Sequence, residues 1–443
     1  MSSVLIIGAG RSATSLINYM LSKAADHNWT ITVADADPEA AKRKVNGHPN
    51  GHAVWLDANK PNDRKDLIGR HKLVISMLPP CLHYQVALDC ILLRKHLITA
   101  SYLSKEMHDL GEQARENGLV FMGELGLDPG IDHMSAMQKI DEIRAKGGKL
   151  TAFYSHTGGL VAPESDTNPW HYKFTWNPRN VVLAGQGTAQ YLYQNKLKYI
   201  IYQRLFKEAR SLDIPDIGQF EMYANRDSLR YREVYGLQNI PTILRGTIRH
   251  KGFCSAWNAL IAIGLTDTNL PISGSEDISY NELMDAYCSP NTPGNTVKER
   301  IANLIGTTPN SEIIEKLEWL GLFSRRKIGI PNATPALILE NLLLSKWELQ
   351  PNDRDMVIMH HEFEYTLDNK KHHLSSTLTM KGNDAKDTAM ARLVGLPMGI
   401  FARQLLLGNI TTVGVNLPVM PDVYNPVLAE LKTFGVTFTE HEY

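Results

Sequence analysis

The chain has 443 residues, enough for two or three domains of roughly 100–200 residues each. Its formal charge is −1, with 46 Lys plus Arg against 47 Asp plus Glu, so no basic excess is present to attract a nucleic-acid backbone. No apolar run reaches the ~20 residues of a membrane span, and the first residues lack the charged start of a signal peptide. The four cysteines are scattered and form no CxxC pair. Composition therefore predicts a cytoplasmic globular protein without a nucleic-acid partner, a membrane partner or a disulfide framework.

Apolar runs alternate with helical stretches over the first 125 residues. The runs that we expect to be strands are residues 4–7, 29–34, 73–78, 96–101 and 118–122. Residues 84–94 and 105–117 carry apolar side chains at helical spacing. This alternation indicates an α/β domain with an open parallel sheet.

A glycine-rich turn joins the first expected strand to the first helix. Gly8 permits the tight turn, Gly10 lets a pyrophosphate approach the backbone, and Ala13 is the small residue where helix packs on strand. Free backbone N–H groups and the helix dipole stabilise phosphates at such a turn. The expected contacts of the turn with a dinucleotide are Gly8, Ala9, Gly10, Arg11, Ser12 and Ala13.

Asp35 ends the second expected strand, 25 residues after Gly10. A carboxylate there accepts hydrogen bonds from both ribose hydroxyls of NAD and repels the 2′-phosphate of NADP. Arg43 is too far along the next helix to compensate for that charge, but Arg11 lies in the turn where it can contact a phosphate. We therefore expect NAD as the preferred cofactor and leave NADP open.

Beyond residue 126 the strand–helix alternation ends. Strands are expected at 150–154 and 242–249, with a helical stretch near 195–208 between them. Residues 255–345 are mostly helical in pattern, and residues 355–360 and 374–380 look like two strands joined by a turn at 368–370. Residues 389–407 are expected to form a long apolar helix.

The segment Gly-Glu-Leu-Gly-Leu-Asp-Pro-Gly-Ile-Asp-His at 123–133 resembles the signature of the saccharopine reductase family (saccharopine dehydrogenase, L-glutamate-forming). Further matches follow in the same order over nearly the whole chain, at 100–102, 157–160, 168–169, 172–176, 225–228, 245–247, 319–323, 354–356 and 395–397. The resemblance implies an NAD(P)-dependent oxidoreductase of lysine metabolism that acts on the CH–NH group of a secondary amine. Such enzymes interconvert saccharopine with L-glutamate and 2-aminoadipate 6-semialdehyde.

The resemblance also implies a division into three domains. Residues 1–125 and 390–443 would form a Rossmann-type parallel sheet domain, completed by the C-terminal segment. Residues 126–252 and 346–389 would form a mixed α/β substrate domain, and residues 253–345 a helical insertion. A homodimer is expected from the family alone.

Saccharopine carries three carboxylates, and arginine suits such a ligand because its fork pairs with a carboxylate through two hydrogen bonds. By the resemblance, the substrate contacts are Ser101, Tyr102, Arg226, Thr247, Ile248 and Arg249. Arg245 is expected to brace the site. Asp128 and Tyr102 are the candidates for proton transfer.

Further cofactor contacts are expected outside the glycine-rich turn. The resemblance implies Leu127, Asp128 and Pro129, where nicotinamide meets substrate, and Phe174, Thr175 and Trp176. Asp57, Met77 and Leu78 follow strands, on the crevice side of an α/β sheet.

The chain departs from the fungal members of the family at two positions. Thr157 stands where they have a cysteine before a Gly-Gly pair, so a thiol acid–base role cannot operate, and Asp35 stands where they carry basic or neutral residues. The histidines at 360, 361, 372 and 373 are adjacent pairs in expected strands and point to opposite faces, so no metal site is predicted. His133 is expected to be structural.

Two other functions stay open from the sequence. A related imine reductase, such as a carboxynorspermidine or carboxyspermidine dehydrogenase, would take a diamine-derived substrate and leave Arg226 without a purpose. A non-catalytic dinucleotide-binding protein would bind nicotinamide without turnover. The direction of the reaction in the cell and the identity of the proton-transfer residue cannot be read from the sequence.

Overall fold

The computed structural model describes residues 2–443, which form two compact units. The first unit contains the chain up to Leu150 together with Tyr365–Tyr443, and the second contains Thr151–Glu364. Both division points fall inside long strands, β7 (Lys149–Val161) and β13 (Asp355–Leu367). The helices of the expected insertion lie within the second unit, and the three-domain division stays a prediction.

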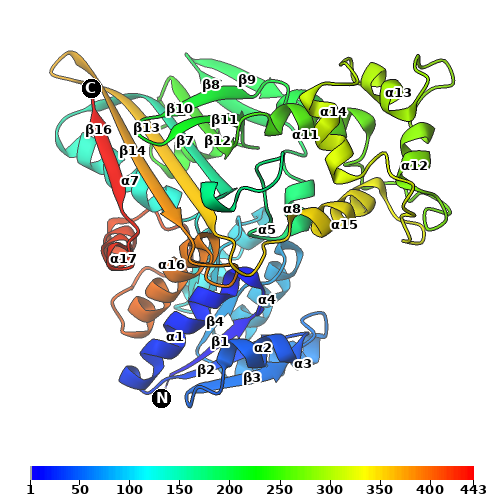
Figure 1. Cartoon of the computed structure of the whole chain (residues 1–443). Coiled ribbons are helices and arrows are strands. Elements are labelled where there is room, and N and C mark those ends of the chain that lie inside the picture. Colours follow the sequence, from blue (N-terminus) through cyan, green and yellow to red (C-terminus); the bar gives the residue numbers. More distant parts are fainter. Residues whose placement is uncertain (1) are drawn as a thin grey trace. The chain divides into compact units, whose positions relative to one another are not determined.

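The first unit is built on a seven-stranded sheet, all of whose paired strands run parallel. Its order is β15-β6-β5-β4-β1-β2-β3, of which β4, β1, β2 and β3 are labelled in Figure 1. The strands are β1 (Ser3–Ile7), β2 (Thr30–Asp35), β3 (Gly51–Trp55), β4 (Leu73–Ser76), β5 (His96–Thr99), β6 (Val120–Met122) and β15 (Gly414–Asn416). Strand order reverses between β1 and β4, so the loops after these two strands border the crevice where α/β sheets bind ligands.

The C-terminal segment completes this sheet, which confirms the expected Rossmann-type fold. Strand β15 pairs in parallel with β6, and helix α16 (Ala389–Leu406) packs against α1 (Thr14–His27). Two glycines allow the close approach, because a Cβ at Gly395 would lie 2.6 Å from the backbone nitrogen of Leu16 and one at Gly399 would lie 2.6 Å from the Tyr19 ring. The long apolar helix expected from the sequence is therefore part of the first unit, beside α1 (Figure 1).

The remaining elements of the first unit are helices and two further strands, β14 and β16, which pair antiparallel with each other. They are η1 (Arg11–Ala13), α2 (Pro38–Val45), α3 (Pro61–Gly69), α4 (Pro80–Leu93), α5 (Lys105–His108), α6 (Gly111–Glu116), α7 (Ile131–Ala145), β14 (Lys370–Lys381), α17 (Pro421–Thr433) and β16 (Phe438–Glu442). The helix expected over 105–117 is two short helices, with Asp109 and Leu110 between them. Strand β3 was not expected, because its residues do not form a continuous apolar run and two of its five are exposed.

The second unit combines a mixed sheet with a helical segment. Its sheet order is β10-β11-β12-β7-β13, with β8 and β9 as a hairpin on β12. The strands not yet placed are β8 (Ala189–Tyr193), β9 (Lys196–Ile200), β10 (Arg210–Ile214), β11 (Gly218–Ala224) and β12 (Thr242–Arg249). The helices are η2 (Pro163–Ser165), α8 (Pro178–Val182), α9 (Tyr202–Leu205), α10 (Arg230–Val234), α11 (Phe253–Ile263), α12 (Tyr280–Ala286), α13 (Val297–Leu304), α14 (Glu312–Leu320) and α15 (Pro335–Trp347).

The helical stretch predicted near 195–208 is wrong. Residues 189–200 form the β8–β9 hairpin, and only the short α9 follows it. Gln194 and Asn195 have φ values of 49° and 61°, the left-handed conformation that a two-residue hairpin turn requires. The apolar spacing of this segment reflects the alternation of a strand and not the period of a helix.

An aromatic core joins the helices of the second unit to its sheet. Trp170, Trp257 and Trp347 are fully buried, and the Phe253 and Trp257 rings stack at 5.5 Å. The indole of Trp170 donates to the Lys316 carbonyl at 3.0 Å.

No helix within residues 2–443 combines the length and the apolar character needed to cross a membrane.

Candidate functional site

The glycine-rich turn has the geometry that a pyrophosphate needs. Gly8 has a φ of 108°, and a Cβ there would lie 2.9 Å from the Met77 carbonyl oxygen, so only glycine fits. A Cβ at Gly10 would meet nothing within 4 Å, which leaves the backbone open on that side. Arg11 is exposed and Ser12 half-buried, whereas Ala13 is fully buried under α16. The structure thus brings the turn, the start of α1 and the loop after β4 together.

Asp35 lies directly against this turn. Its Oδ2 accepts from the Ala9 backbone N–H at 2.6 Å, and its Oδ1 accepts from the Asp37 backbone N–H at 2.8 Å. The carboxylate is half-buried, and each oxygen keeps a further lone pair for a ribose hydroxyl. Arg43 pairs with Asp37 at 3.5 Å, and both side chains of that pair are largely exposed.

The other expected strand-end contacts have different surroundings. Met77 and Leu78 are half-buried, and the Met77 N–H donates to the Ile7 carbonyl at 2.8 Å, beside Gly8. The Asp57 carboxylate accepts from the backbone and side-chain nitrogens of Asn59 at 3.0 and 3.1 Å, which lowers its pKa. Asp57 therefore shapes the turn before α3, and its contact with a cofactor stays a prediction.

The loop at 126–130 folds tightly back on itself and projects Asp128. The Gly126 N–H donates to the Pro129 carbonyl at 2.8 Å, and the Ile131 N–H donates to the Gly126 carbonyl at 2.9 Å. Gly130 has a φ of 147°, and a Cβ there would come within 2.1 Å of the Gly126 oxygen. Leu127 and Pro129 are buried, whereas Asp128 is half-buried.

Asp128 and Tyr102, the two candidates for proton transfer, are hydrogen-bonded to each other. The Tyr102 hydroxyl donates to Asp128 Oδ1 at 3.1 Å, and Tyr102 is 43% exposed. They come from loops 26 residues apart in the chain. An accessible phenol on a carboxylate forms a short path along which a proton can move.

Glu124, which the sequence reasoning did not single out, holds the loop that carries Tyr102. Its carboxylate accepts from the Leu103 N–H at 3.1 Å, and its backbone N–H donates to the Ser101 carbonyl at 3.1 Å. Its other oxygen lies 3.0 Å from His133 Nε2, and both side chains are fully buried. His133 is thus part of the support behind the loop, in agreement with its expected structural role.

Ser101 makes a contact that the sequence did not predict. Its hydroxyl lies 2.8 Å from Nε2 of His83, which enters from the first turn of α4. Ser76 and Thr99 also contact the His83 ring. Only the pairing of β4 with β5 places Ser76 beside Thr99, so no sequence spacing marks this cluster.

In the second unit, Arg226 lies exposed on a turn that does not depend on its side chain. Its carbonyl accepts from the Gln190 N–H at 2.8 Å, and the Asn225 N–H donates to the Arg245 carbonyl at 2.8 Å. Asp227 Oδ1 caps the following residues at Leu229 and Arg230. Arg245 is buried over the Tyr231 ring at 4.1 Å, which fits the bracing role expected for it.

Strand β12 carries the other expected substrate residues. Arg249 is 3% exposed, packs over the Tyr172, Tyr223 and Phe253 rings, and donates through Nη1 to the Ile248 carbonyl at 3.0 Å. Its Nε has no hydrogen-bond partner among the described residues. A buried guanidinium with an unsatisfied donor suits an anionic ligand. The Ile248 side chain lies in the core of the second unit.

Tyr223 links three of these residues and was missed by the sequence reasoning. Its hydroxyl accepts from Arg249 Nη2 at 3.4 Å, Tyr223 pairs with Thr247 across β11 and β12, and the charge of Arg226 acts on it. Burial raises the pKa of Tyr223, and the two arginines and Thr247 oppose that rise. The only sequence feature that could have indicated Tyr223 as a site residue is its position three residues before Arg226, in strand β11.

The segment at 174–176 and Thr157 are largely buried within the second unit. The Phe174 side chain is in the aromatic core, and its N–H donates to the Trp347 carbonyl at 2.7 Å. The Trp176 indole donates to the Tyr172 hydroxyl at 3.2 Å. The hydroxyls of Thr175 and Thr157 are buried without a partner in the described part of the chain, and Thr157 pairs with Thr247 across β7 and β12.

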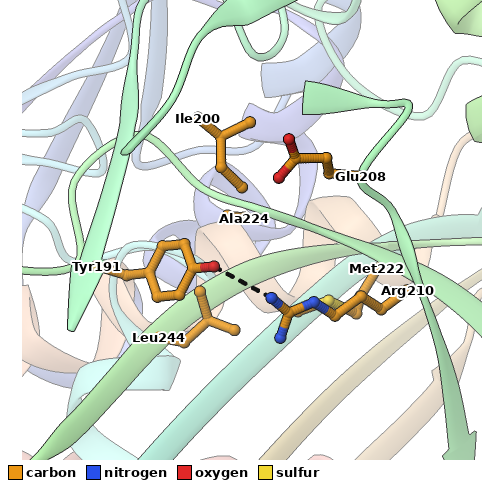
Figure 2. Close-up of a pocket in the computed structure, with 7 residues that line it drawn as sticks. All are labelled: Tyr191, Ile200, Glu208, Arg210, Met222, Ala224 and Leu244. Atoms are coloured by element: carbon orange, nitrogen blue, oxygen red, sulfur yellow. Dashed lines mark hydrogen bonds between the residues drawn. The ribbon is translucent and has the colours of Figure 1, made fainter. Parts of the chain in front are cut away.

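A small hollow in the second unit is lined by residues that neighbour Tyr223 and Arg245 in the chain. Figure 2 shows that Arg210 points toward the Tyr191 hydroxyl, to which it donates at 3.1 Å. The other lining residues are Ile200, Glu208, Met222, Ala224 and Leu244. None of the expected site residues lines it.

Within residues 2–443, no group of three or more His, Cys, Asp or Glu is placed to hold a metal ion.

The parallel sheet, the open glycine turn and the carboxylate at the end of β2 define a Rossmann-type dinucleotide-binding fold, the fold of NAD(P)-dependent oxidoreductases. Residues 4–122 match the family model described as the saccharopine dehydrogenase NADP binding domain, and residues 126–436 match the saccharopine dehydrogenase C-terminal domain. The chain belongs to the saccharopine dehydrogenase family.

Relatives and a solved structure agree with this assignment. The saccharopine dehydrogenase [NADP(+), L-glutamate-forming] of Schizosaccharomyces pombe is 34% identical, with 99% of each chain covered. An alpha-aminoadipic semialdehyde synthase of Arabidopsis thaliana is 33% identical, and this chain spans 45% of its length. The structure of apo saccharopine dehydrogenase (L-Glu forming) from Saccharomyces cerevisiae superposes with a TM-score of 0.88 at 31% identity, covering all of both chains.

Proposed function

We propose that this chain interconverts saccharopine with L-glutamate and 2-aminoadipate 6-semialdehyde, with a nicotinamide dinucleotide as the hydride carrier. The observation that carries the proposal is the similarity over the full chain to saccharopine dehydrogenases named as L-glutamate-forming, in sequence and in fold. The proposed substrate contacts are Ser101, Tyr102, Arg226, Thr247, Ile248 and Arg249, of which Ile248 can act only through its backbone. The cytoplasmic location and the homodimer stay predictions.

Charge supports saccharopine over a diamine-derived substrate. Three carboxylates need fixed cations, and the exposed Arg226 and the buried Arg249 supply two guanidinium groups. The unsatisfied Nε of Arg249 supports the same role, because a buried donor without an acceptor is unfavourable unless a ligand supplies one. A polyamine-like substrate would require carboxylates at these positions.

The proposed proton path runs between Asp128 and Tyr102. The bound nicotinamide supplies or accepts the hydride at the carbon of the C–N bond. The substrate amine must be neutral to lose hydride, so a base must hold its proton, and Asp128 is the proposed base. Tyr102 donates to Asp128 at 3.1 Å in the resting site; once Asp128 is protonated, the phenol turns its own proton to solvent and accepts the one from Asp128, which its 43% exposure allows. Thr157 lacks an ionisable group and takes no part in proton transfer.

A paired assay tests the proposed function. Purified protein is mixed with saccharopine and either NAD or NADP, and the absorbance of reduced nicotinamide is followed. Turnover is expected with both cofactors and is expected to be faster with NAD. Absence of turnover with either cofactor, alongside tight binding of reduced nicotinamide, would favour a non-catalytic protein instead.

We also propose that Asp35 makes NAD the preferred cofactor, although the relatives are named as NADP(+) enzymes. Replacing Asp35 with serine is expected to lower kcat/KM with NAD about tenfold, the worth of hydrogen bonds to one charged group. The same change is expected to raise kcat/KM with NADP, because the carboxylate no longer repels a 2′-phosphate and the exposed Arg11 lies in the glycine-rich turn that Asp35 contacts.

Asp37→Asn is the matched control for this change. Asp37 lies two residues further on, and its carboxylate caps α2 through the Glu39 N–H at 3.0 Å. Asparagine keeps that cap and removes one charge together with the exposed ion pair to Arg43, so the ratio of the two cofactor efficiencies is expected to change far less than in the Asp35 variant. An equal change of the ratio in both variants would show that general surface charge, and not Asp35, sets the preference.

A further inference from the structure

A buried histidine connects three hydroxyl groups at the carboxyl ends of β4 and β5. Nδ1 of His83 lies 2.9 Å from Ser76 Oγ, and its Nε2 lies 2.8 Å from Ser101 Oγ and 3.2 Å from Thr99 Oγ1. His83 is 4% exposed, Ser76 1% and Thr99 2%, whereas Ser101 is half-buried. Ser101 is therefore the end of this chain of hydroxyls that a ligand can reach.

The ring of His83 is uncharged at neutral pH. Burial lowers its pKa to about 4, and the three groups that contact its nitrogens are hydroxyls. In a neutral imidazole one nitrogen donates a hydrogen bond and the other accepts one. The tautomer consequently decides which way each hydroxyl proton points.

Either tautomer gives both ring nitrogens a hydroxyl partner, and the tautomer with its proton on Nε2 leaves the Ser101 hydroxyl able to donate to a ligand. Thr99 Oγ1 already accepts from the Ser101 backbone N–H at 3.3 Å. If the Ser76 hydroxyl donates to Nδ1, then the proton of the ring sits on Nε2 and is donated to Ser101 Oγ at 2.8 Å. The hydroxyl proton of Ser101 then points away from the ring, toward whatever lies on its open side.

We propose that His83 is a positioning residue for substrate: its Nε2–H fixes the Ser101 hydroxyl as a hydrogen-bond donor to a carboxylate of saccharopine. This inference rests on the proposed function and deepens it, because it adds a residue that acts through Ser101. The oxygen that accepts from a ring N–H is also the better donor, since hydrogen bonds in a chain polarise one another.

Two amide replacements separate the two ring nitrogens. In His83→Gln the amide nitrogen reaches the place of Nε2 and can still donate to Ser101, whereas in His83→Asn it reaches only the place of Nδ1. His83→Asn is expected to raise KM for saccharopine about fivefold, the worth of one hydrogen bond, with His83→Gln close to the unaltered enzyme. KM for the dinucleotide is expected to stay the same in both variants.

The dinucleotide KM distinguishes this role from a merely structural one. Helix α4 begins at Pro80, directly after Met77 and Leu78, so a distorted helix would disturb the proposed cofactor contacts and raise both KM values. Ser101→Ala alone is expected to raise KM for saccharopine, and His83→Asn added to it is expected to cause no further change. If His83→Asn does not fold, Ser76→Ala is used, because it removes the group that places the proton on Nε2.

The outcomes separate this inference from the proposed function. No turnover of saccharopine by the unaltered chain would overturn both. Turnover with equal KM in the asparagine and glutamine variants, or additive effects of His83→Asn and Ser101→Ala, would overturn the positioning role alone. A rise of the saccharopine KM in His83→Asn, rescued by glutamine and absent in the Ser101→Ala background, supports it.

Discussion

Replacing Asp128 with asparagine is expected to lower kcat about a hundredfold, within the range that one general acid–base group contributes. Asparagine fills the same space and still accepts from the Tyr102 hydroxyl, but it cannot take a proton from the substrate amine. KM for the dinucleotide is expected to change little, because the loop that carries residue 128 is closed by backbone hydrogen bonds of Gly126, Pro129 and Ile131. Steady-state kinetics with saccharopine measure both constants.

Tyr102→Phe is the matched variant for this experiment. It removes only the hydroxyl that donates to Asp128 at 3.1 Å, so its loss of kcat is expected to be smaller than that of Asp128→Asn. Titration with reduced nicotinamide, followed by its fluorescence, checks that both variants still bind cofactor. An Asp128→Asn enzyme with unaltered kcat would exclude Asp128 as the base, and a larger loss in Tyr102→Phe would transfer that role to the phenol.

Replacing Arg226 with alanine is expected to raise KM for saccharopine about thirtyfold, since hydrogen bonds to charged groups are worth about 1.5–3 kcal/mol. The side chain is exposed, and backbone bonds at Asn225, Arg226 and Ser228 hold its turn, so folding is expected to be unaffected. The expected effect on kcat is small, because Arg226 binds the carboxylate in substrate and transition state alike.

Arg226→Lys and Arg204→Ala complete this experiment. Lysine keeps the charge but loses the two-pronged fork, so an intermediate KM is expected. Arg204 is exposed in the same unit and pairs with Glu208 at 2.5 Å, and its loss is expected to leave KM unchanged. Equal KM values for Arg226→Ala and the unaltered enzyme would remove the main support for a tricarboxylate substrate.

Most strands and helices of the fold could be predicted from the sequence, because the spacing of apolar residues within each segment indicates whether it is a strand or a helix. The run at 4–7 is apolar on both faces, as a buried parallel strand requires, and it lies in strand β1 of the structure. The segment at 195–208 was mistaken because a two-residue turn at Gln194 and Asn195 left no glycine to mark it. Strand β3 was not predicted, because it lies at the edge of the sheet and its residues are only partly buried.

The phosphate turn and Asp35 belong to the part of the site that the sequence by itself determined. A tight turn between strand and helix requires small residues, and Gly8, Gly10 and Ala13 meet that requirement locally. Strand β2 pairs with β1, so the residue at the end of β2 lies beside the turn that follows β1. The Ala9 N–H donates to Asp35, so the carboxylate lies against the turn, and the cofactor contacts of both stay predictions. The roles given to Arg226 and Thr247 came from resemblance and still await experiment.

Only the tertiary structure decided which side chains hold the reactive ones in place. His83 meets Ser101, Glu124 meets Leu103, and Tyr102 meets Asp128 because strands and loops far apart in sequence end at the same edge of one sheet. A sequence pattern records the period of one element at a time, whereas such contacts depend on register and loop path between elements. The residues joined by such long-range hydrogen bonds have no characteristic separation in the sequence, so a single sequence does not indicate them.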